Sequence, residues 1–343
     1  MAKRPTIPDL AVAAGVSIAT VDRVLNGRAP VREETTRRVY EAAQRIGYHA
    51  VSLIGHRLQV DLPELTIGYV LHKEKQDFYQ TFIEEAVTAA ANATKVRAKA
   101  VIEFSQSQTP RDFVACMERL APRVDVLGAT AVNHAEVTEA VQRLQASGTP
   151  CFALLNDFAQ GVRKSYIGMN NIKIGRIAAH MIATAMRQKG PVALFVGGYR
   201  WHGHELRETG FRSYFREYAP QCQLLETRVN LETRQLTYEA THDLLDRHPD
   251  LAGIYCAGGG MEGAIAALRE LREPNEVALV VQELTRESRL ALAERFASMV
   301  IATPVAKICA DMVDLAQVVL NEDAVAIPGQ HFLRPDIYLP ESV

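Results

Sequence analysis

The first fifty residues place their apolar side chains at the spacing of three short amphipathic helices. The positions that would share one helix face are Ile7, Leu10, Ala11 and Ala14, then Val21, Val24 and Leu25, then Val39, Ala42, Ala43 and Ile46. Each stretch ends at a glycine, Gly15, Gly27 or Gly47, which can adopt the left-handed conformation of a sharp turn. Two short helices joined by a glycine turn and supported by a third predict an all-α helix-turn-helix head.

From residue 66 onward, short β-branched runs alternate with helical stretches. The expected strands are 66–71, 97–104, 124–129, 150–155, 165–168, 192–196, 224–230, 251–256, 277–281 and 297–302. The expected helices are 78–93, 110–121, 134–147, 173–189, 204–218, 232–248, 262–271 and 305–320. This alternation predicts an α/β body with parallel sheets wrapped by helices. Because about 280 residues are long for a single sheet, we expect two lobes.

Composition narrows the class of protein. The 343 residues are 48% hydrophobic and 23% charged, as in a globular protein of two or three domains. No run of about eighteen uncharged apolar residues occurs, so we expect no membrane-spanning helix. The basic amino terminus lacks the apolar segment of a secretory signal. Five cysteines lie far apart without a C-x-x-C pair, which argues against disulfides and a zinc cluster and for a cytoplasmic location.

The charge is distributed unevenly along the chain. Residues 1–58 hold nine basic and five acidic side chains, a net charge of +4. Since the whole chain carries −2, the remaining 285 residues carry −6. A basic head on an acidic body suggests that the head binds a polyanion, although a solvated basic face would have the same composition.

Residues 6–48 resemble the DNA-binding head of the lactose-repressor (LacI) family, with almost no gaps. The resemblance implies that the helix from Ser17 to Asn26 enters the major groove of operator DNA. The family's DNA-contacting positions are held here by Thr6, Ser17, Ile18, Ala19, Thr20, Arg23, Asn26 and Arg28. The base-reading positions among them are Ile18, Ala19 and Arg23. Arg23 can donate two hydrogen bonds to guanine, which agrees with that role.

The head departs from the family pattern at Asp22, at Arg32, where a capping Ser is common, and in the hinge. Asp22 stands where the family usually has Ser, beside Arg23; its carboxylate could orient Arg23, accept from a cytosine amino group or repel phosphate. The family's hinge segment is replaced by residues 49–58. In relatives a hinge leucine wedges into the minor groove, and Leu53 and Leu58 are the candidates here.

Polar and aromatic residues follow the expected strands of the body. Parallel sheets bind ligands at the carboxyl ends of their strands. The strand-to-helix junctions read 77–79, 156–157, 197–200, 258–260 and 282–285. Their carboxylates, amides, arginine and aromatic rings suit a small polyhydroxylated molecule.

The body, about residues 66–340, resembles the periplasmic-binding-protein-like effector module of the same family. The resemblance implies effector contacts from Phe78, Tyr79, Asn156, Asp157, Arg207 and Glu283. It also divides the chain into a head with hinge at 1–58, a linker at 59–65 and a body at 66–343. Lobe 1 would comprise about 66–160 and 300–328, and lobe 2 about 161–299 and 329–343. An Asn-Asp pair common in the family is replaced here by Ala257-Gly258.

Other motifs allow different interpretations. Gly258-x-Gly260-x-x-Gly263, with Glu283 twenty residues later, fits a dinucleotide fingerprint, so a nicotinamide-binding redox sensor or oxidoreductase is the alternative function. His202 and His204 lack a third ligand nearby, so we expect no metal. Asp157 and Glu283 form a possible carboxylate pair, but nothing else indicates a nucleophile. We therefore expect no enzymatic activity, no catalytic residues and no cofactor.

The favoured function is a cytoplasmic transcriptional regulator, expected to be a repressor. As the resemblance implies, a homodimer would bind a roughly palindromic double-stranded operator. A sugar or sugar derivative bound between the lobes would change their closure and thereby control operator binding. Trp201 either stacks on that sugar or fills the edge of a lobe.

Overall fold

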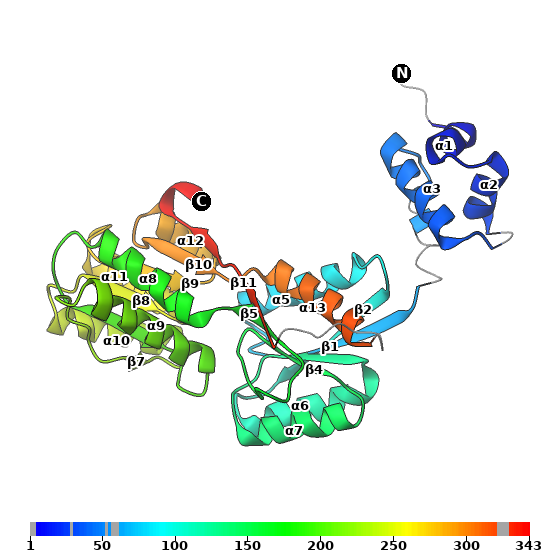
Figure 1. The fold of residues 1–343 in the computed structure, drawn as a ribbon. Coiled ribbons are helices and arrows are strands. Elements are labelled where there is room, and N and C mark those ends of the chain that lie inside the picture. Colours follow the sequence, from blue (N-terminus) through cyan, green and yellow to red (C-terminus); the bar gives the residue numbers. More distant parts are fainter. Residues whose placement is uncertain (1–4, 28–29, 52–53, 56–61, 321–328) are drawn as a thin grey trace. The chain divides into compact units, whose positions relative to one another are not determined.

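A computed structural model describes residues 5–27, 30–51, 54–55, 62–320 and 329–343. It contains two compact units, residues 1–65 with 90–99 and residues 66–89 with 100–343 (Figure 1). We call residues 1–55 the head and residues 66–343 the body. Arg28 and the two hinge candidates, Leu53 and Leu58, lie outside the described residues.

The head contains the three helices predicted from the apolar pattern, α1 (Ile7–Ala14), α2 (Ile18–Asn26) and α3 (Glu33–Ile46). Leu10, Val21 and Val39 are fully buried where the three helices meet. The three terminal glycines have φ values of 63°, 63° and 67°, which explains why glycine stands at each turn. Arg38 of α3 donates to the Ala14 and Gly15 carbonyls at 2.9 and 3.2 Å and so satisfies carbonyls left free at the end of α1.

The first lobe of the body is built on one sheet with the strand order β11-β5-β4-β3-β1-β2. Its strands are β1 (Glu64–His72), β2 (Arg97–Ser105), β3 (Val126–Ala129), β4 (Cys151–Leu154), β5 (Tyr166–Met169) and β11 (Gln330–Leu333). Its helices are α5 (Asp77–Ala91), α6 (Pro110–Leu120), α7 (Ala135–Ala146) and α13 (Val305–Leu320), with the short η1 (Ala121–Arg123) after α6. Figure 1 shows α5 and α13 on one face of the sheet and α6 and α7 on the other.

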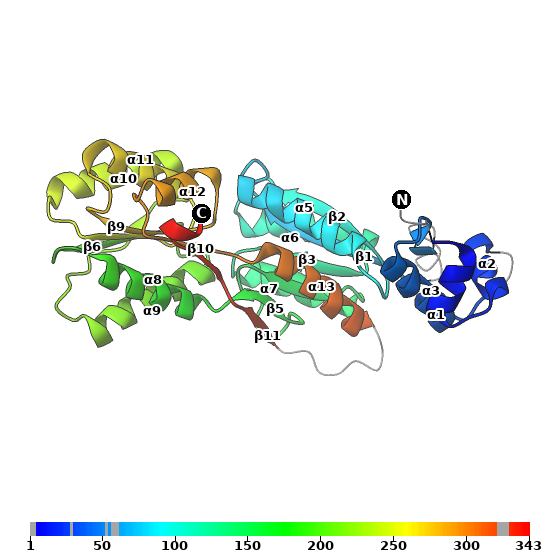
Figure 2. The same ribbon diagram turned by 90° about the horizontal axis from the view of Figure 1, so that it is seen from above.

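The second lobe is built on a sheet with the order β12-β10-β9-β8-β6-β7. Its strands are β6 (Val192–Val196), β7 (Arg228–Val229), β8 (Gly253–Cys256), β9 (Ala278–Gln282), β10 (Met299–Ala302) and β12 (Asp336–Tyr338). Its helices are α8 (Asn171–Ala185), α9 (His202–Tyr218), α10 (Arg234–Arg247), α11 (Met261–Leu271), α12 (Arg286–Ala293) and η2 (Pro340–Ser342). Figure 2 shows α8 and α9 on one face and α10, α11 and α12 on the other.

The strands are parallel where their pairing is described, except that β12 runs antiparallel to β10. The predicted two-lobed α/β body with parallel sheets is therefore confirmed. Two buried cores cover the two faces of the second sheet, one formed with α8 and α9 and the other with α10, α11 and α12.

The chain crosses between the lobes three times, and the crossings differ from the boundaries expected at about 160, 300 and 328. Strand β5 belongs to the first sheet, β10 to the second and β11 to the first. The crossings therefore follow β5, β10 and β11. Buried parallel strands of either sheet carry the same apolar pattern, so the sequence pattern alone does not assign a strand to a lobe. Helix α12 and strands β11 and β12 were not predicted.

No helix among the described residues has both the length and the apolar character needed to cross a bilayer. Of the five cysteines, four are buried and Cys222 is half-buried; all five are free thiols. Burial raises the pKa of the Cys151 thiol to about 12. Cys151 and Cys256 are packed in strands of the core, as their apolar surroundings predicted.

Candidate functional site

The exposed face of α2 carries the side chains expected to read base pairs. Val21, Val24 and Leu25 bury the opposite face of this helix against α1 and α3. Ile18 is 55% exposed, and Ala19 and Arg23 are exposed as well. Arg23 donates through Nε to the Ala19 carbonyl at 3.2 Å. This hydrogen bond holds the guanidinium of Arg23 beside Ala19.

Several of the other DNA-contact candidates bond to neighbouring side chains within the head. Ser17 caps α2 and accepts from the Thr20 amide at 3.1 Å. The Thr6 hydroxyl donates to Asp9 at 2.7 Å. Asp22, the departure from the family pattern, accepts from the Asn26 amide nitrogen at 2.6 Å. The carboxylate of Asp22 therefore orients Asn26 in this structure.

The body contains a cavity of about 350 Å³ at the carboxyl ends of strands from both sheets. His72 ends β1, Thr130 directly follows β3, and Asn156 follows β4. From the second sheet, Gly258 follows β8, while Gln282 ends β9. The cavity therefore lies where parallel sheets place their ligands, as expected from the strand-end residues.

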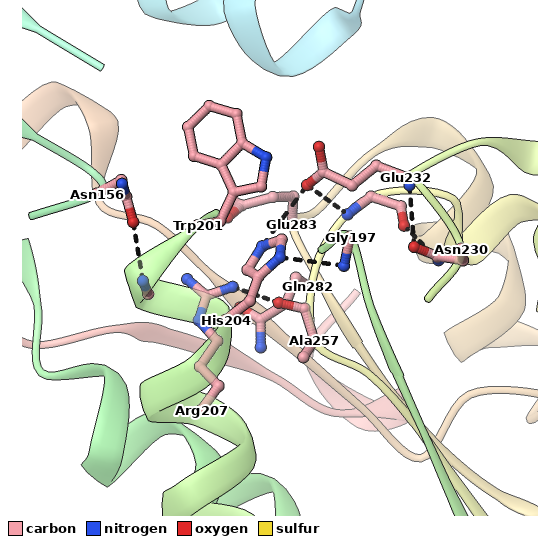
Figure 3. Close-up of polar contacts among 12 residues, drawn as sticks. Asn156, Gly197, Trp201, His204, Arg207, Asn230, Glu232, Ala257, Gln282 and Glu283 are labelled. Atoms are coloured by element: carbon pink, nitrogen blue, oxygen red, sulfur yellow. Dashed lines mark hydrogen bonds and ion pairs between the residues drawn. The ribbon is translucent and has the colours of Figure 1, made fainter. Parts of the chain in front are cut away.

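Arg207, on the first half of α9, projects a buried guanidinium into this cavity (Figure 3). Its Nε donates to Asn171 at 2.8 Å and its Nη1 to the Ala257 carbonyl at 2.5 Å. No carboxylate among the described residues forms an ion pair with it. The cation is therefore positioned by neutral acceptors, which leaves Nη2 to bind a ligand oxygen.

Glu283 also lines the cavity, but its carboxylate is already bonded. Thr303 donates to it from its backbone nitrogen at 2.9 Å and from its hydroxyl at 2.6 Å. Burial raises the pKa of Glu283, while the Thr303 hydrogen bonds and the nearby Arg207 oppose the shift. The residue has a φ of 67°, so the turn after β9 aims this side chain toward β10.

The side chains of the neighbouring candidates Asn156 and Asp157 have different surroundings in the structure. Asn156 lines the cavity and bridges the lobes, because its amide donates to the Ala131 carbonyl at 2.7 Å and accepts from the Gly203 nitrogen at 2.8 Å. Asp157 does not line the cavity. It forms two hydrogen bonds to buried Arg163, at 2.5 and 2.7 Å. In this structure the carboxylate of Asp157 neutralises Arg163 instead of lining the cavity, which differs from the expected effector contact.

The aromatic pair predicted beside the first strand lies at the cavity. Phe78 and Tyr79 both line it, with ring centroids 5.1 Å apart in an edge-on arrangement. The Tyr79 hydroxyl bonds to His72 Nε2. Phe78 thus offers an apolar surface, while Tyr79 fixes a neighbouring polar side chain.

Trp201 and His72 form a stacked pair that sequence analysis did not predict. Their ring centroids are 4.7 Å apart with an interplanar angle of 22°. Trp201 lies directly before α9 in the second lobe, yet it packs in the core of the first and donates to Gln108 at 3.1 Å. Trp201 therefore fills the edge of the first lobe and also lines the cavity, and its stacking on a sugar stays a prediction.

A second unpredicted group surrounds Glu232, in the loop after β7. Glu232 forms an ion pair with Lys73, and its Oε1 lies 3.6 Å from His204 Nε2. Burial opposes ionisation of Glu232, but the charges of its partners outweigh burial and lower its pKa to about 2. Burial lowers the pKa of His204 to about 4 and that of His72 to about 3, so both imidazoles are neutral near pH 7.

The glycines of the dinucleotide-like motif make room for this group. A Cβ on Gly258 would lie 2.7 Å from His204 and 2.9 Å from the Glu232 carboxylate. A Cβ on Gly263 would lie 2.1 Å from the Arg234 carbonyl, where α10 and α11 pack together. Close packing thus accounts for the glycine spacing without a nucleotide. No cluster of three metal-ligating side chains occurs among the described residues.

A helix-turn-helix head joined to a two-lobed body with a cavity at its strand ends defines a DNA-binding regulator with an effector domain. Residues 6–50 match the profile of the lacI family of bacterial regulatory proteins, and residues 67–324 match that of a periplasmic binding protein domain. The chain therefore belongs to the LacI family of bacterial regulators, and its body is a periplasmic binding protein domain. The resemblance noted in the sequence is confirmed.

Similar proteins include other regulators and sugar-binding proteins. The HTH-type transcriptional regulator GntR of Pseudomonas aeruginosa is 27% identical over 293 residues, covering 81% of this chain and 79% of that protein. GalS of Salmonella typhimurium is 22% identical over 266 residues, covering 77% and 75%. A periplasmic solute binding protein from Actinobacillus succinogenes with bound D-allose has a TM-score of 0.74 and 19% identity, covering 81% and 98%. An ABC transporter solute binding protein from Burkholderia graminis in complex with D-arabinose has a TM-score of 0.75 and 19% identity, covering 82% and 97%.

Proposed function

We propose that this regulator represses transcription from a roughly palindromic operator, as a cytoplasmic homodimer, and that a sugar or sugar derivative controls its binding. The observation that carries the proposal is a single chain with two sites. An exposed recognition helix presents Ile18 and Arg23, and a separate cavity presents Arg207 among hydrogen-bonding groups. The relatives GntR and GalS are named as HTH-type transcriptional regulators.

The character of the cavity supports a polyhydroxylated effector. Its lining combines the aromatic rings of Phe78 and Trp201 with amide, hydroxyl and guanidinium groups. Aromatic rings cover the C–H face of a sugar, while convergent polar groups bond to its hydroxyls. Solved structures with the same fold hold D-allose and D-arabinose.

The proposed control of DNA binding depends on contributions from both lobes. Phe78 and Thr130 reach the cavity from the first lobe, and Arg207 and Gln282 from the second. A ligand that contacts both groups binds one relative position of the lobes more tightly than another. Ligand binding thereby shifts the population between lobe arrangements, and this shift changes how well the head binds DNA.

The hydrogen bonds of the two candidate acids support a binding role with no enzymatic activity. Asp157 is neutralised by Arg163, and Glu283 is held by Thr303. His204 Nδ1 accepts from the Gly197 nitrogen at 3.1 Å, which orients the ring toward Glu232. These contacts position side chains for binding and fold stability.

The proposal is tested by selecting genomic fragments with purified, effector-free protein and sequencing what is bound. We expect a few roughly palindromic sites whose half-sites are spaced for a two-fold dimer. Addition of the sugar that the flanking genes transport or degrade should change the occupancy of these sites. Absence of any binding at low salt, where phosphate contacts are strongest, would reject the DNA-binding function.

A further inference from the structure

We infer that His72, Thr130 and Gln282 bind the effector directly, and that the effector carries a hydroxyl group that donates to the Gln282 carbonyl oxygen. The inference rests on the proposed function, because it assigns contacts to the same effector. It adds three residues to the site. Gln282 belongs to a strand-to-helix junction singled out in the sequence, but none of the three was named there as an effector contact.

The evidence is a set of buried polar atoms without partners. His72 Nδ1, Thr130 Oγ1 and Gln282 Oε1 have no hydrogen-bond partner in the described part of the chain. The three residues are only 3%, 2% and 2% exposed. Buried polar atoms are nearly always hydrogen-bonded, because leaving one unpaired is costly. All three residues line the same cavity of about 350 Å³, so a ligand in it can supply the missing partners.

Each of these side chains is held in place by contacts on its other side. His72 bonds to Tyr79 through Nε2 and stacks on Trp201, so the direction of Nδ1 is fixed. Gln282 donates from Nε2 to the Tyr255 hydroxyl at 2.8 Å, which directs its oxygen away from Tyr255. Sites in which supporting contacts fix the side chains bind with less loss of conformational entropy.

The chemistry of these atoms restricts the ligand. The Gln282 oxygen only accepts hydrogen bonds, so the ligand must donate there. A carboxylate or phosphate oxygen at that point would leave both groups unsatisfied. Thr130 can donate or accept. It lies at the carboxyl end of a strand in the first sheet, whereas Gln282 lies at the carboxyl end of a strand in the second. The ligand therefore carries a hydroxyl at Gln282 and a second hydrogen-bonding group at Thr130, and it contacts both lobes, as a sugar ring can.

The experiment starts from the full chain and a panel of sugars: D-allose, D-arabinose, D-ribose, D-glucose and D-galactose. The sequence contains one tryptophan, Trp201, and it lines the cavity, so its emission reports sugar binding. For the sugar with the strongest response, calorimetry gives Kd for Thr130→Val, His72→Phe, Gln282→Leu and Gln282→Glu. The matched control is Thr241→Val, which alters a fully buried threonine of α10 whose hydroxyl bonds to the Thr237 carbonyl at 2.7 Å.

We expect Thr130→Val and Gln282→Leu each to raise Kd by about tenfold or more, because each removes one ligand hydrogen bond. Gln282→Glu keeps an acceptor at the same place and should remain within a few-fold of the parent. Thr241→Val should not change Kd. Thermal melting and operator binding without sugar verify that each variant is folded.

Unchanged Kd values for Thr130→Val and Gln282→Leu, in folded protein that binds a sugar, would overturn the assignment and leave the proposed function standing. An equal loss of binding in Gln282→Leu and Gln282→Glu would overturn the donor assignment, because it means that the ligand accepts at Gln282. If the parent binds none of the sugars but still selects operators, both the assignment and the sugar effector are rejected, and the DNA-binding function stands.

Discussion

Lys73 and Glu232 form an ion pair that connects the loop after β1 in the first lobe to the loop after β7 in the second. Both residues have left-handed backbone conformations, with φ values of 55° and 56°. Their side chains retain only 19% and 14% of their exposure. Strained conformations of this kind persist where the surrounding contacts stabilise them. We conclude that this ion pair helps to hold the two lobes in their positions around the cavity.

Replacing Lys73 should therefore lower the free energy of unfolding more than replacing a surface cation does. Lys73→Met leaves the Glu232 carboxylate buried without its ammonium partner, which we expect to cost about 3 kcal/mol in free energy of unfolding. The double variant Lys73→Met/Glu232→Gln should recover most of that loss, because it removes the unpaired charge. Urea unfolding measures both. Arg143→Met is the control, since Arg143 pairs with Glu118 on the surface and should contribute at most about 1 kcal/mol. A loss as small for Lys73→Met as for Arg143→Met would contradict the role of the pair.

The buried histidines should make the stability of the body depend on pH. Burial lowers the pKa of His72 from 6.5 to about 3 in the folded state. As the pH falls below 6.5, the unfolded chain takes up a proton that folded His72 does not. The stability due to neutral His72 is thus present above pH 6.5 and is lost as the pH falls toward 3.

His72→Phe keeps an aromatic ring beside Trp201 but removes this proton uptake. Between pH 6 and 4, we expect the free energy of unfolding of the variant to fall less steeply than that of the parent, by about 1.4 kcal/mol per pH unit at most. Urea unfolding followed by circular dichroism at several pH values measures the slopes. His134→Asn is the control, because His134 is 47% exposed and caps α7, a position that Asn also suits. Parallel slopes for His72→Phe and the parent would contradict the prediction.

The sequence predicted those parts of the protein whose pattern lies within one short stretch of the chain. The head follows from apolar spacing and terminal glycines, and all three glycines have the expected left-handed conformation. Phe78 and Glu283 follow predicted strands, and strand ends meet at the cavity, whereas Arg207 lies within α9 and was expected only from the family resemblance. The rule failed for Asp157, since its carboxylate bonds to Arg163 in a loop whose course has no local signal.

Glu232 was not predicted for a similar reason. It follows a strand of only two residues, β7, and it turns toward the cavity through two consecutive left-handed residues, Leu231 and Glu232 itself. Neither is a glycine, so no sequence signal marks the turn. The partners of Glu232 come from positions 73 and 204, so only the tertiary structure brings the group together.

Replacing Arg207 should affect the response to sugar, whereas replacing Asp157 should affect stability. Arg207→Ala removes the buried cation of the cavity and should abolish the response to sugar, while operator affinity of the sugar-free protein stays intact. Asp157→Asn should leave sugar affinity within a few-fold of the parent but lower stability, because it leaves buried Arg163 without its carboxylate. Operator binding with and without sugar, together with thermal melting, separates the two effects. An unchanged sugar response in Arg207→Ala would show that the effector binds elsewhere.

Arg23 is expected to read a base, and its replacement tests the geometry of the exposed face of α2. If Arg23 bonds to a guanine, Arg23→Ala should weaken operator binding by about 1–3 kcal/mol and relax the sequence preference at one symmetric pair of positions. Arg37→Ala is the control within the head, because Arg37 lies on α3 and pairs with Glu33 at 2.9 Å. It should at most weaken binding to all sequences alike. Competition with operators mutated one base pair at a time measures both. Uniform weakening by Arg23→Ala would mean that Arg23 contacts only phosphate, and Ile18 and Ala19 would then carry the base recognition of this helix.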